Sequence, residues 1–231
     1  MNDEPATTAK STRHSRADVV DAALGILDEF GLPDLTMRRL AAKLDVQPSA
    51  LYWHFDNKQA LLAAVADRII AGARVRDVAE AAGDGLGTRA SERASWHVTT
   101  RAEALALRDA LLAYRDSAEV VSSTLALGLG AGEAHCRLAA AIASGGFDVQ
   151  ASEASASALL HYLLGHVWHE QQRLQADSLG VVAPGYAVHP ESASDVLATG
   201  GGASPVDGTA AFEFGLTLLL GGLSQLTRVR S

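Results

Sequence analysis

The residue types best suited to chemistry gather in one short stretch, QPSALYWHF, which spans residues 47–55. Ser49 and Ala50 are small enough to let a helix backbone approach DNA base edges, and the Ala50 methyl group can meet that of thymine. Tyr52 and His54 carry polar tips that suit phosphate oxygens. Trp53 fits either a phosphate contact or packing. Together these residues predict a surface that binds DNA.

Cations lie close to this stretch, although the whole chain carries a net charge of −8 at pH 7. Residues 35–58 include four basic and two acidic residues, which gives this stretch a net charge of +2. We expect Lys58 at the start of a helix, where backbone amides and a cation together favour phosphate. Arg38 is placed to touch the DNA backbone or a nearby guanine. The distribution of charge therefore permits DNA binding despite the acidic total.

A second group of chemically capable residues comprises His161, His166, His169 and Glu170. His166 lies three residues before His169 and four before Glu170, so one helix face can present all three. This spacing leaves open a metal-dependent hydrolase as the alternative function. The order differs from HExxH, and neither a nucleophile constellation nor a glycine-rich phosphate loop accompanies it. We therefore expect no enzyme, no metal site and no cofactor.

The composition predicts a globular protein of the cytoplasm. The chain has 231 residues, of which 48% are hydrophobic, so a sizeable core is expected. Cys136 is the single cysteine, which fits a reducing compartment. The polar N-terminus lacks the apolar segment of a signal peptide, and no apolar run approaches the roughly 18 residues that cross a bilayer.

Apolar residues recur at helical spacing along most of the chain, and no strand-like alternation interrupts them. The predicted fold class is therefore all-α. The first helix is expected to begin after Ser15, with Asp18 completing a capping box, and to stop at Gly31. Beyond the first three helices, further helices are expected at about 56–70, 89–116, 133–143, 151–174 and 209–229.

Two short helices are expected between the first helix and the helix at 56–70. Thr36 is a good N-cap for a helix at about 36–44, and Pro48 suits the first turn of a helix at about 48–55. Asp45, between them, tolerates left-handed geometry better than most residues. Leu51 and Phe55 are four residues apart and share the inward face. This arrangement is a helix-turn-helix, whose second helix can enter the major groove.

The chain divides into three parts in this interpretation. Residues 1–14 form a flexible arm, 15–65 a DNA-binding domain with the helix-turn-helix, and 66–231 a domain for ligand binding and dimerisation. Residues 178–208 are rich in Gly, Pro, Ala and Ser, which predicts a long loop inside the last part. Near the end of the DNA-binding domain, a capping box of Asp56 and Gln59 is expected to start the helix at 56–70.

The stretch LTMRRLAAKLDVQPSALYWHFDNKQALL resembles the helix-turn-helix of the TetR family of transcriptional regulators. ALYWHF followed by NKQALL is a specific motif, and Asp45 stands where the family usually has Gly. The resemblance implies a repressor that binds a palindromic operator and is released by a small-molecule inducer. It implies DNA contacts for one set of residues: Arg38, Pro48, Ser49, Ala50, Tyr52, His54 and Lys58. Trp53 stays open between a phosphate contact and packing.

The rest of the chain resembles the tetracycline-repressor branch of that family, on Trp96 and the segments RDALLAYRDSAEVVSST, LLHYLLGHVWHEQQ and AFEFGLTLLLGGL. The resemblance implies a helical core with a ligand tunnel. It also implies a homodimer joined by a four-helix bundle from the helices near 152–174 and 209–228. Gly215, Gly221 and Gly222 within an apolar stripe agree with close helix approach.

The resemblance also bears on the ligand. Val121 occupies the family's metal-binding histidine position, His169 that of its acidic partner, and Glu103 that of a drug-binding asparagine. We therefore expect an inducer other than magnesium–tetracycline, with cationic or hydrogen-bonding character. Candidate pocket residues combine apolar surface with a few polar groups: His97, Glu103, Leu107, Tyr114, Val121, His135, His161 and Trp168. His161 and His169 can share a helix face and fit a dimer interface as well.

Overall fold

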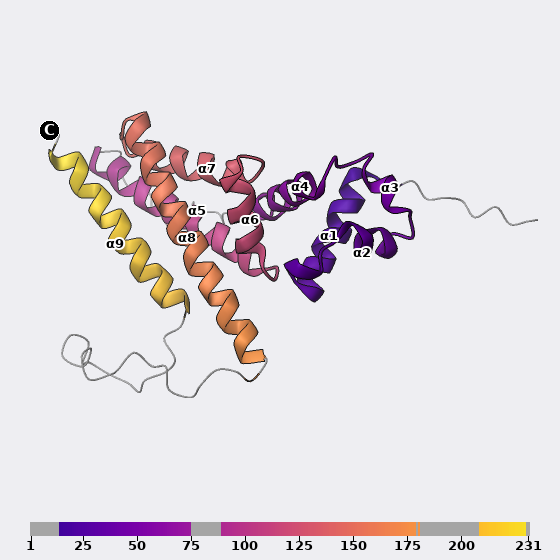
Figure 1. Cartoon of the computed structure of the whole chain (residues 1–231). Coiled ribbons are helices and arrows are strands. Elements are labelled where there is room, and N and C mark those ends of the chain that lie inside the picture. Colours follow the sequence, from indigo (N-terminus) through magenta and orange to yellow (C-terminus); the bar gives the residue numbers. More distant parts are fainter. Residues whose placement is uncertain (1–13, 75–88, 179, 181–207, 230–231) are drawn as a thin grey trace, which may run out of the picture.

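The computed structural model describes residues 14–74, 89–178, 180 and 208–229, and all regular structure within these ranges is helical. This confirms the predicted all-α fold class. Figure 1 shows two units, with α1–α3 at one end, α5–α9 at the other and α4 between them. Residues 1–13 of the expected arm and nearly all of the expected 178–208 loop lie outside the described residues. Among the described residues, no helix has the length and hydrophobicity needed to span a bilayer.

The smaller unit, which is named the DNA-binding unit after the role that the sequence predicts for it, consists of four α-helices and one short 3-10 helix. Its local sequence explains most of their ends. The elements are α1 (Arg16–Phe30), η1 (Leu32–Asp34), α2 (Met37–Lys43), α3 (Pro48–Leu51) and α4 (Lys58–Ala71). Ser15 and Asp18 form the expected capping box, and Gly31 ends α1 with φ +85°. The Thr36 side chain caps α2, and Asp45 adopts the left-handed conformation at φ +53°.

Two helix ends in this unit differ from the sequence-based expectation. α3 ends at Leu51, because the amides of His54 and Phe55 both donate to the Leu51 carbonyl and tighten the following turn. α4 begins at Lys58, and its cap is Asn57, whose side chain accepts from the Ala60 amide at 2.9 Å. The expected capping box of Asp56 and Gln59 is therefore wrong by one residue.

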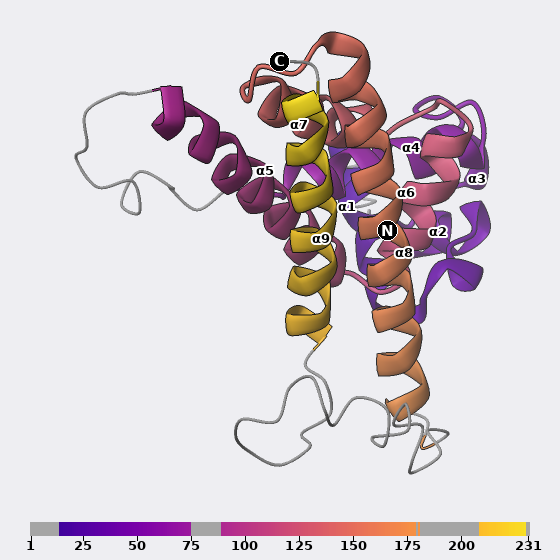
Figure 2. The same ribbon diagram turned by 90° about the vertical axis from the view of Figure 1, so that its left-hand side faces the viewer.

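The larger unit packs α5, α7 and α8 against one another, with α6 against α4 and α9 beside α8 (Figure 2). The bounds are α5 (Arg89–Leu112), α6 (Ser117–Ala126), α7 (Gly132–Ala143), α8 (Val149–Ser178) and α9 (Gly208–Val229). The sequence predicted one helix over 89–116 and no separate α6. In the structure the chain turns after α5, with Asp116 in the left-handed conformation at φ +53°.

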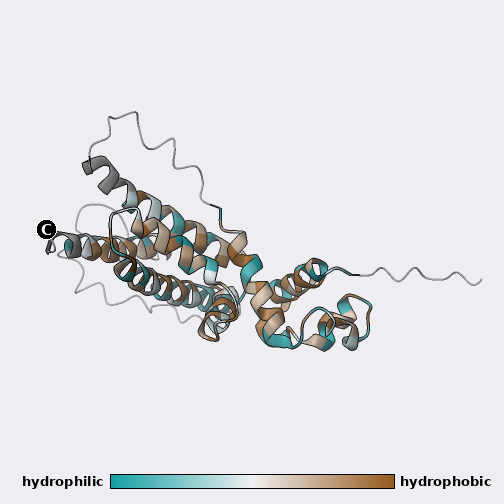
Figure 3. Ribbon diagram, turned by 90° about the horizontal axis from the view of Figure 1, so that it is seen from above, coloured by the Kyte–Doolittle hydropathy of each residue, from teal (hydrophilic) through white to brown (hydrophobic). Residues whose placement is uncertain are grey.

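The hydrophobic core continues from one unit into the other. Buried residues of α1 and α4 belong to the same cluster as those of α5, α6, α7, α8 and α9. Hydrophobic residues, brown in Figure 3, accordingly occur in the helices of both units. Where α4 meets the α6–α7 turn, a Cβ added at Gly130 would lie 2.9 Å from the Ala63 carbonyl oxygen. The Asp67 side chain accepts from the Ala131 amide at 2.8 Å, so α4 is anchored directly to the larger unit.

Candidate nucleic-acid interface and sensing core

The α3 segment, which comprises α3 and the turn that follows it (residues 48–55), has one buried face and one exposed face. Leu51 and Phe55 are at most 2% exposed, which confirms the inward face expected from their spacing. The residues with DNA contacts in the sequence-based prediction lie on the other side. Those that are exposed are Arg38, Pro48, Ser49, Tyr52 and Trp53, and those that are half-buried are Ala50, His54 and Lys58.

Contacts from α1 and α2 hold this segment in place. The Arg16 guanidinium lies over the Phe55 ring, 4.6 Å from its centroid. The Val46 amide donates to the Ala41 carbonyl at 3.0 Å, which closes the turn between α2 and α3. The His14 ring nitrogen lies 2.9 Å from the Leu44 carbonyl oxygen. Residues of α1 and α2 therefore hold the α3 segment on its buried side, and its other side stays exposed.

Trp53 is 89% exposed. The sequence left this residue open between packing and a phosphate contact. Its ring does not pack against the described residues, because it lies almost wholly in solvent. A large aromatic ring with a single N–H donor is thus presented beside Tyr52 and His54.

The basic side chains near α3 differ in whether they form an ion pair within the chain. Arg39 pairs with Asp34 and lies 3.6 Å from the centroid of the Phe30 ring. Among the described residues, neither Arg38 nor Lys58 forms an ion pair. Lys58 is the first residue of α4, so its charge adds to the amide groups of that helix N-terminus. Arg38 and Lys58 are therefore available to an anionic partner.

In the larger unit, Leu107 and Val121 are fully buried in the core. Glu103 pairs with Arg137 of α7, with Nη2 2.5 Å and Nε 2.9 Å from the same carboxylate oxygen. Both side chains are less than one-fifth exposed, and Arg137 also donates to the Ile70 carbonyl of α4 at 3.5 Å. The structure thus gives Glu103 a charged partner that its sequence position did not reveal.

Three further pocket candidates are half-buried and occupied by neighbours. The His97 ring lies against that of Trp96, with centroids 3.9 Å apart and planes tilted by 33°, and burial lowers the pKa of His97 below its usual 6.5. His135 reaches α8, where its ring nitrogen lies 3.0 Å from the Ser157 hydroxyl. The Tyr114 carbonyl accepts from the Gln171 side chain at 2.8 Å.

His161 and Trp168 are not brought to the core of this chain. Both lie on the exposed side of α8, with Trp168 41% exposed and its ring against that of His169. Of the eight pocket candidates, six therefore lie in or at the edge of the core, and two lie on the surface of α8.

The alternative metal cluster does not assemble. The His166 ring nitrogen lies 3.1 Å from the Gly208 carbonyl, and its ring packs beside Phe212. Glu170 accepts from Arg108 at 2.7 and 2.8 Å, while His161 and His169 are exposed. Within the part of the chain that the structure describes, no three His, Cys, Asp or Glu residues are grouped to hold a metal ion.

A buried polar network is the feature that the sequence analysis missed. Arg108 is only 6% exposed and lies 5.5 Å from the centroid of the Phe212 ring. Nearby, the Tyr162 hydroxyl donates to the Phe212 carbonyl at 2.9 Å, and burial raises the Tyr162 pKa. The available signal was a charged residue, Arg108, placed among apolar residues at helical spacing.

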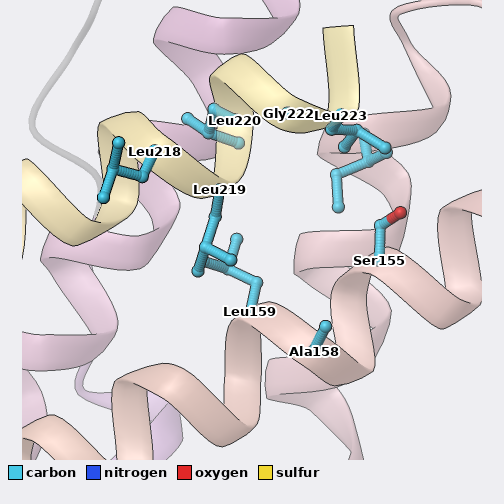
Figure 4. Close-up of a pocket in the computed structure, with 9 residues that line it drawn as sticks. Ser155, Ala158, Leu159, Leu218, Leu219, Leu220, Gly222 and Leu223 are labelled. Atoms are coloured by element: carbon cyan, nitrogen blue, oxygen red, sulfur yellow. The ribbon is translucent and has the colours of Figure 1, made fainter. Parts of the chain in front are cut away.

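An apolar groove lies where α9 meets α8. It measures about 260 Å³, and its lining includes Ser155, Ala158 and Leu159 of α8 with Leu219 and Leu223 of α9. In Figure 4 the Leu219 side chain points toward Leu159. Several large apolar side chains on α9 are also solvent-exposed, up to 67% at Phe214: Phe214, Leu218 and Leu219.

Both units match known proteins. Residues 19–65 match the family described as "Bacterial regulatory proteins, tetR family", and residues 89–227 match "Tetracyclin repressor-like, C-terminal domain". Tetracycline repressor protein class G of Vibrio anguillarum is 34% identical over 216 residues, which cover 93% of this chain and 96% of that repressor.

Solved structures extend the likeness to three dimensions. The crystal structure of BioQ from Mycobacterium smegmatis matches with a TM-score of 0.71 and 39% identity, covering 92% of this chain and 98% of BioQ. A crystal structure of BioQ with its natural double-stranded DNA operator matches with a TM-score of 0.64 and 36% identity, covering 91% and 98%. The likeness therefore spans the DNA-binding unit and the larger unit together.

Proposed function

The chain belongs to the TetR family of bacterial regulatory proteins, and on this basis we propose that it is a transcriptional repressor which a small-molecule inducer releases from a palindromic operator. The observation that carries the proposal is the exposed α3 surface, with Arg38 and Lys58 available beside it. A similar structure, that of BioQ, contains its DNA operator. Family membership supports a regulator over an enzyme.

The α3 residues divide into two roles in this proposal. Ser49 and Ala50 approach base edges in the major groove, because their short side chains let the helix come close. Tyr52, His54 and Lys58 hold phosphate oxygens and fix the orientation of the helix. Trp53 joins the phosphate contacts, since its exposed indole N–H is a donor. Arg38 contacts the backbone next to the same groove.

A homodimer supplies the second α3 surface. A two-fold interface uses the same patch on both copies, and the apolar residues of α8 and α9 provide such a patch. Phe214 and Leu219 are then covered by the second copy. Two α3 segments reach successive major grooves only if they lie roughly 34–36 Å apart. An inducer releases the DNA by binding more tightly to a dimer with a different separation.

We expect an inducer other than a magnesium–tetracycline complex. Val121 is fully buried and apolar, so it offers no metal ligand at the position where the resemblance places a histidine. The Glu103 carboxylate is already neutralised by Arg137, which disfavours a cation there. We therefore propose a neutral, largely apolar inducer with hydrogen-bonding groups that engage Glu103 and Arg137. This narrows the earlier expectation of a cationic or hydrogen-bonding ligand.

A fluorescence-anisotropy titration with the DNA upstream of the chain's own gene tests this function. We expect nanomolar affinity at low salt, a clear margin over random duplex, and weaker binding at the higher of two salt concentrations. Adding magnesium and tetracycline to the complex should leave it intact. Binding that ignores sequence would contradict an operator in this DNA, and efficient release by the drug would contradict the argument from Val121.

A further inference from the structure

One carboxylate in the turn between α5 and α6 contacts both the DNA-binding unit and α8 of the larger unit. Asp116 is 7% exposed and sits in the left-handed conformation. One of its oxygens accepts from the Leu32 amide of the DNA-binding unit at 2.9 Å. The other accepts from the Gln175 side chain of α8 at 2.5 Å. This single side chain therefore joins the first residue of η1, the α5–α6 turn and α8.

The approach on the DNA-binding side is unusually close. Gly31 precedes Leu32 and has φ +85°, a conformation that residues with side chains rarely adopt. A Cβ added at Gly31 would lie 2.7 Å from an Asp116 carboxylate oxygen and 3.2 Å from the Arg115 Nε. The glycine thus lets the α1–η1 junction reach the carboxylate.

On the other side, α8 holds the turn through a second amide side chain. Gln171 is 4% exposed, and the two N–H groups of its side chain are shared among three acceptors at 2.8–3.1 Å: the Leu111 carbonyl, the Tyr114 carbonyl and the Ser117 hydroxyl. Its oxygen accepts from the Ala118 amide at 3.3 Å. Gln171 therefore ties the last turn of α5 and the first turn of α6 to α8, because both helix ends offer backbone groups without helical partners.

We propose that Asp116 is a positioning residue for operator binding, which fixes the DNA-binding unit relative to α8. The inference rests on the proposed function, in which α8 forms part of the dimer interface. A shift of α8 then moves Gln171 and Gln175, and with them the turn and the Leu32 amide. Asp67 and Gly130 attach α4 to the larger unit independently, so loss of Asp116 loosens the DNA-binding unit without detaching it.

Two substitutions at this position separate the carboxylate from the backbone conformation. Asp116→Gly keeps the left-handed turn at little cost and removes the side chain. Asp116→Asn tolerates the same conformation and keeps an oxygen that accepts from Leu32. Asp34→Asn is the matched control, because it removes a carboxylate from the adjoining η1 turn that pairs only within the DNA-binding unit.

Operator affinity is the first readout. We expect Asp116→Gly to weaken specific binding about tenfold, a typical size for coupling between sites, with affinity for random duplex unchanged. Asp116→Asn should recover most of that loss, and Asp34→Asn should behave as the unchanged protein. Equal operator affinity for Asp116→Gly and the unchanged protein would overturn the proposal.

A distance measurement that needs no DNA keeps this test separate from the proposed function. Spin labels are placed on Cys136, the exposed native cysteine of α7, and on Asp28→Cys, at an exposed position of α1. Labelled chains are diluted with cysteine-free chains carrying Cys136→Ser, so that only distances within one chain are recorded. Asp116→Gly should broaden the distribution between the two units, and a distribution as narrow as that of the unchanged chain would overturn the positioning role. Failure of the unchanged protein to bind any operator would instead count against the proposed function alone.

Discussion

The two units differ in where they place their polar side chains. Among the described residues, all the buried polar ones lie in the larger unit: Thr100, Arg108, Asp116, Ser117, Thr124, Ser152 and Gln171. The same unit exposes Phe214, Leu218 and Leu219 on α9. In the described part of the DNA-binding unit no polar side chain is buried, and Arg38, Tyr52 and Trp53 lie at the surface.

This contrast suggests different roles for the two units: the DNA-binding unit holds a surface in place, and the larger unit responds to a ligand. An apolar core is held by close packing, and it contains no buried polar group whose hydrogen-bond partner a ligand could replace. A buried polar network can exchange partners when a ligand or a neighbouring helix moves, and each unmade hydrogen bond is costly. We therefore expect a ligand to change contacts in the larger unit and to leave those inside the DNA-binding unit unchanged.

The largest expected effect concerns the exposed apolar face of the larger unit. Leu219→Glu places a charge in the groove between α8 and α9 and should raise the dimer dissociation constant about a hundredfold or more, the size expected for an unpaired buried charge. Sedimentation equilibrium measures it. Leu127→Glu, at an exposed position at the end of α6, is the control. A dimer that survives Leu219→Glu would place the interface elsewhere.

The next effect tests the core of the DNA-binding unit. Phe55→Ala should lower the free energy of unfolding by about 4 kcal/mol, because it removes a fully buried ring beneath α3. Trp53→Ala changes a neighbouring aromatic that lies in solvent and should alter stability by less than about 0.5 kcal/mol. Urea unfolding followed by circular dichroism compares them. Similar losses in the two variants would contradict the division between a buried and an exposed face.

The buried network of the larger unit is tested by a pair of glutamates. Glu170→Gln leaves Arg108 buried without its counter-charge and should cost about 3 kcal/mol of unfolding free energy. Glu213→Gln breaks the Arg101 pair, where both side chains are more than one-third exposed, and should cost at most about 1 kcal/mol. Thermal unfolding of both variants gives the comparison. Equal costs would show that the Arg108 pair behaves as a surface pair.

The smallest expected effect is a pH dependence at the edge of the larger unit. Burial holds the His97 pKa below its usual 6.5 in the folded chain. Between the lowered pKa of the folded chain and the ordinary pKa of the unfolded chain, the unfolded chain therefore binds more protons. Folding stability should therefore fall as the pH drops below about 6.5, and His97→Asn should remove that part of the loss. Unfolding midpoints at several pH values measure it. An unchanged pH profile in His97→Asn would assign the acid loss to other groups.

The sequence predicted the local features of the DNA-binding unit well, because caps and turns depend on residues close in the chain. Ser15, Gly31, Thr36, Asp45 and Pro48 all have the expected roles. The spacing of Leu51 and Phe55 likewise predicted their burial.

The larger unit was harder to predict, because its polar contacts join residues far apart in sequence. Glu103 meets Arg137 across 34 residues, and no local pattern marks that pair. The break between α5 and α6 falls at Asp116, where neither Gly nor Pro signals a turn. The roles proposed for individual α3 and pocket residues stay predictions, since they depend on partners outside one chain.

The most direct test of the account measures operator binding by Tyr52→Ala and His54→Ala against the unchanged protein. Each substitution removes an expected phosphate contact from the α3 segment, so specific affinity should fall about tenfold. The buried face is left intact, so the unfolding free energy should stay unchanged. Anisotropy titrations with operator and random duplex, beside urea unfolding of the same samples, give both values. Operator affinity that is unchanged in both variants would contradict the assignment of α3 as the DNA-reading surface.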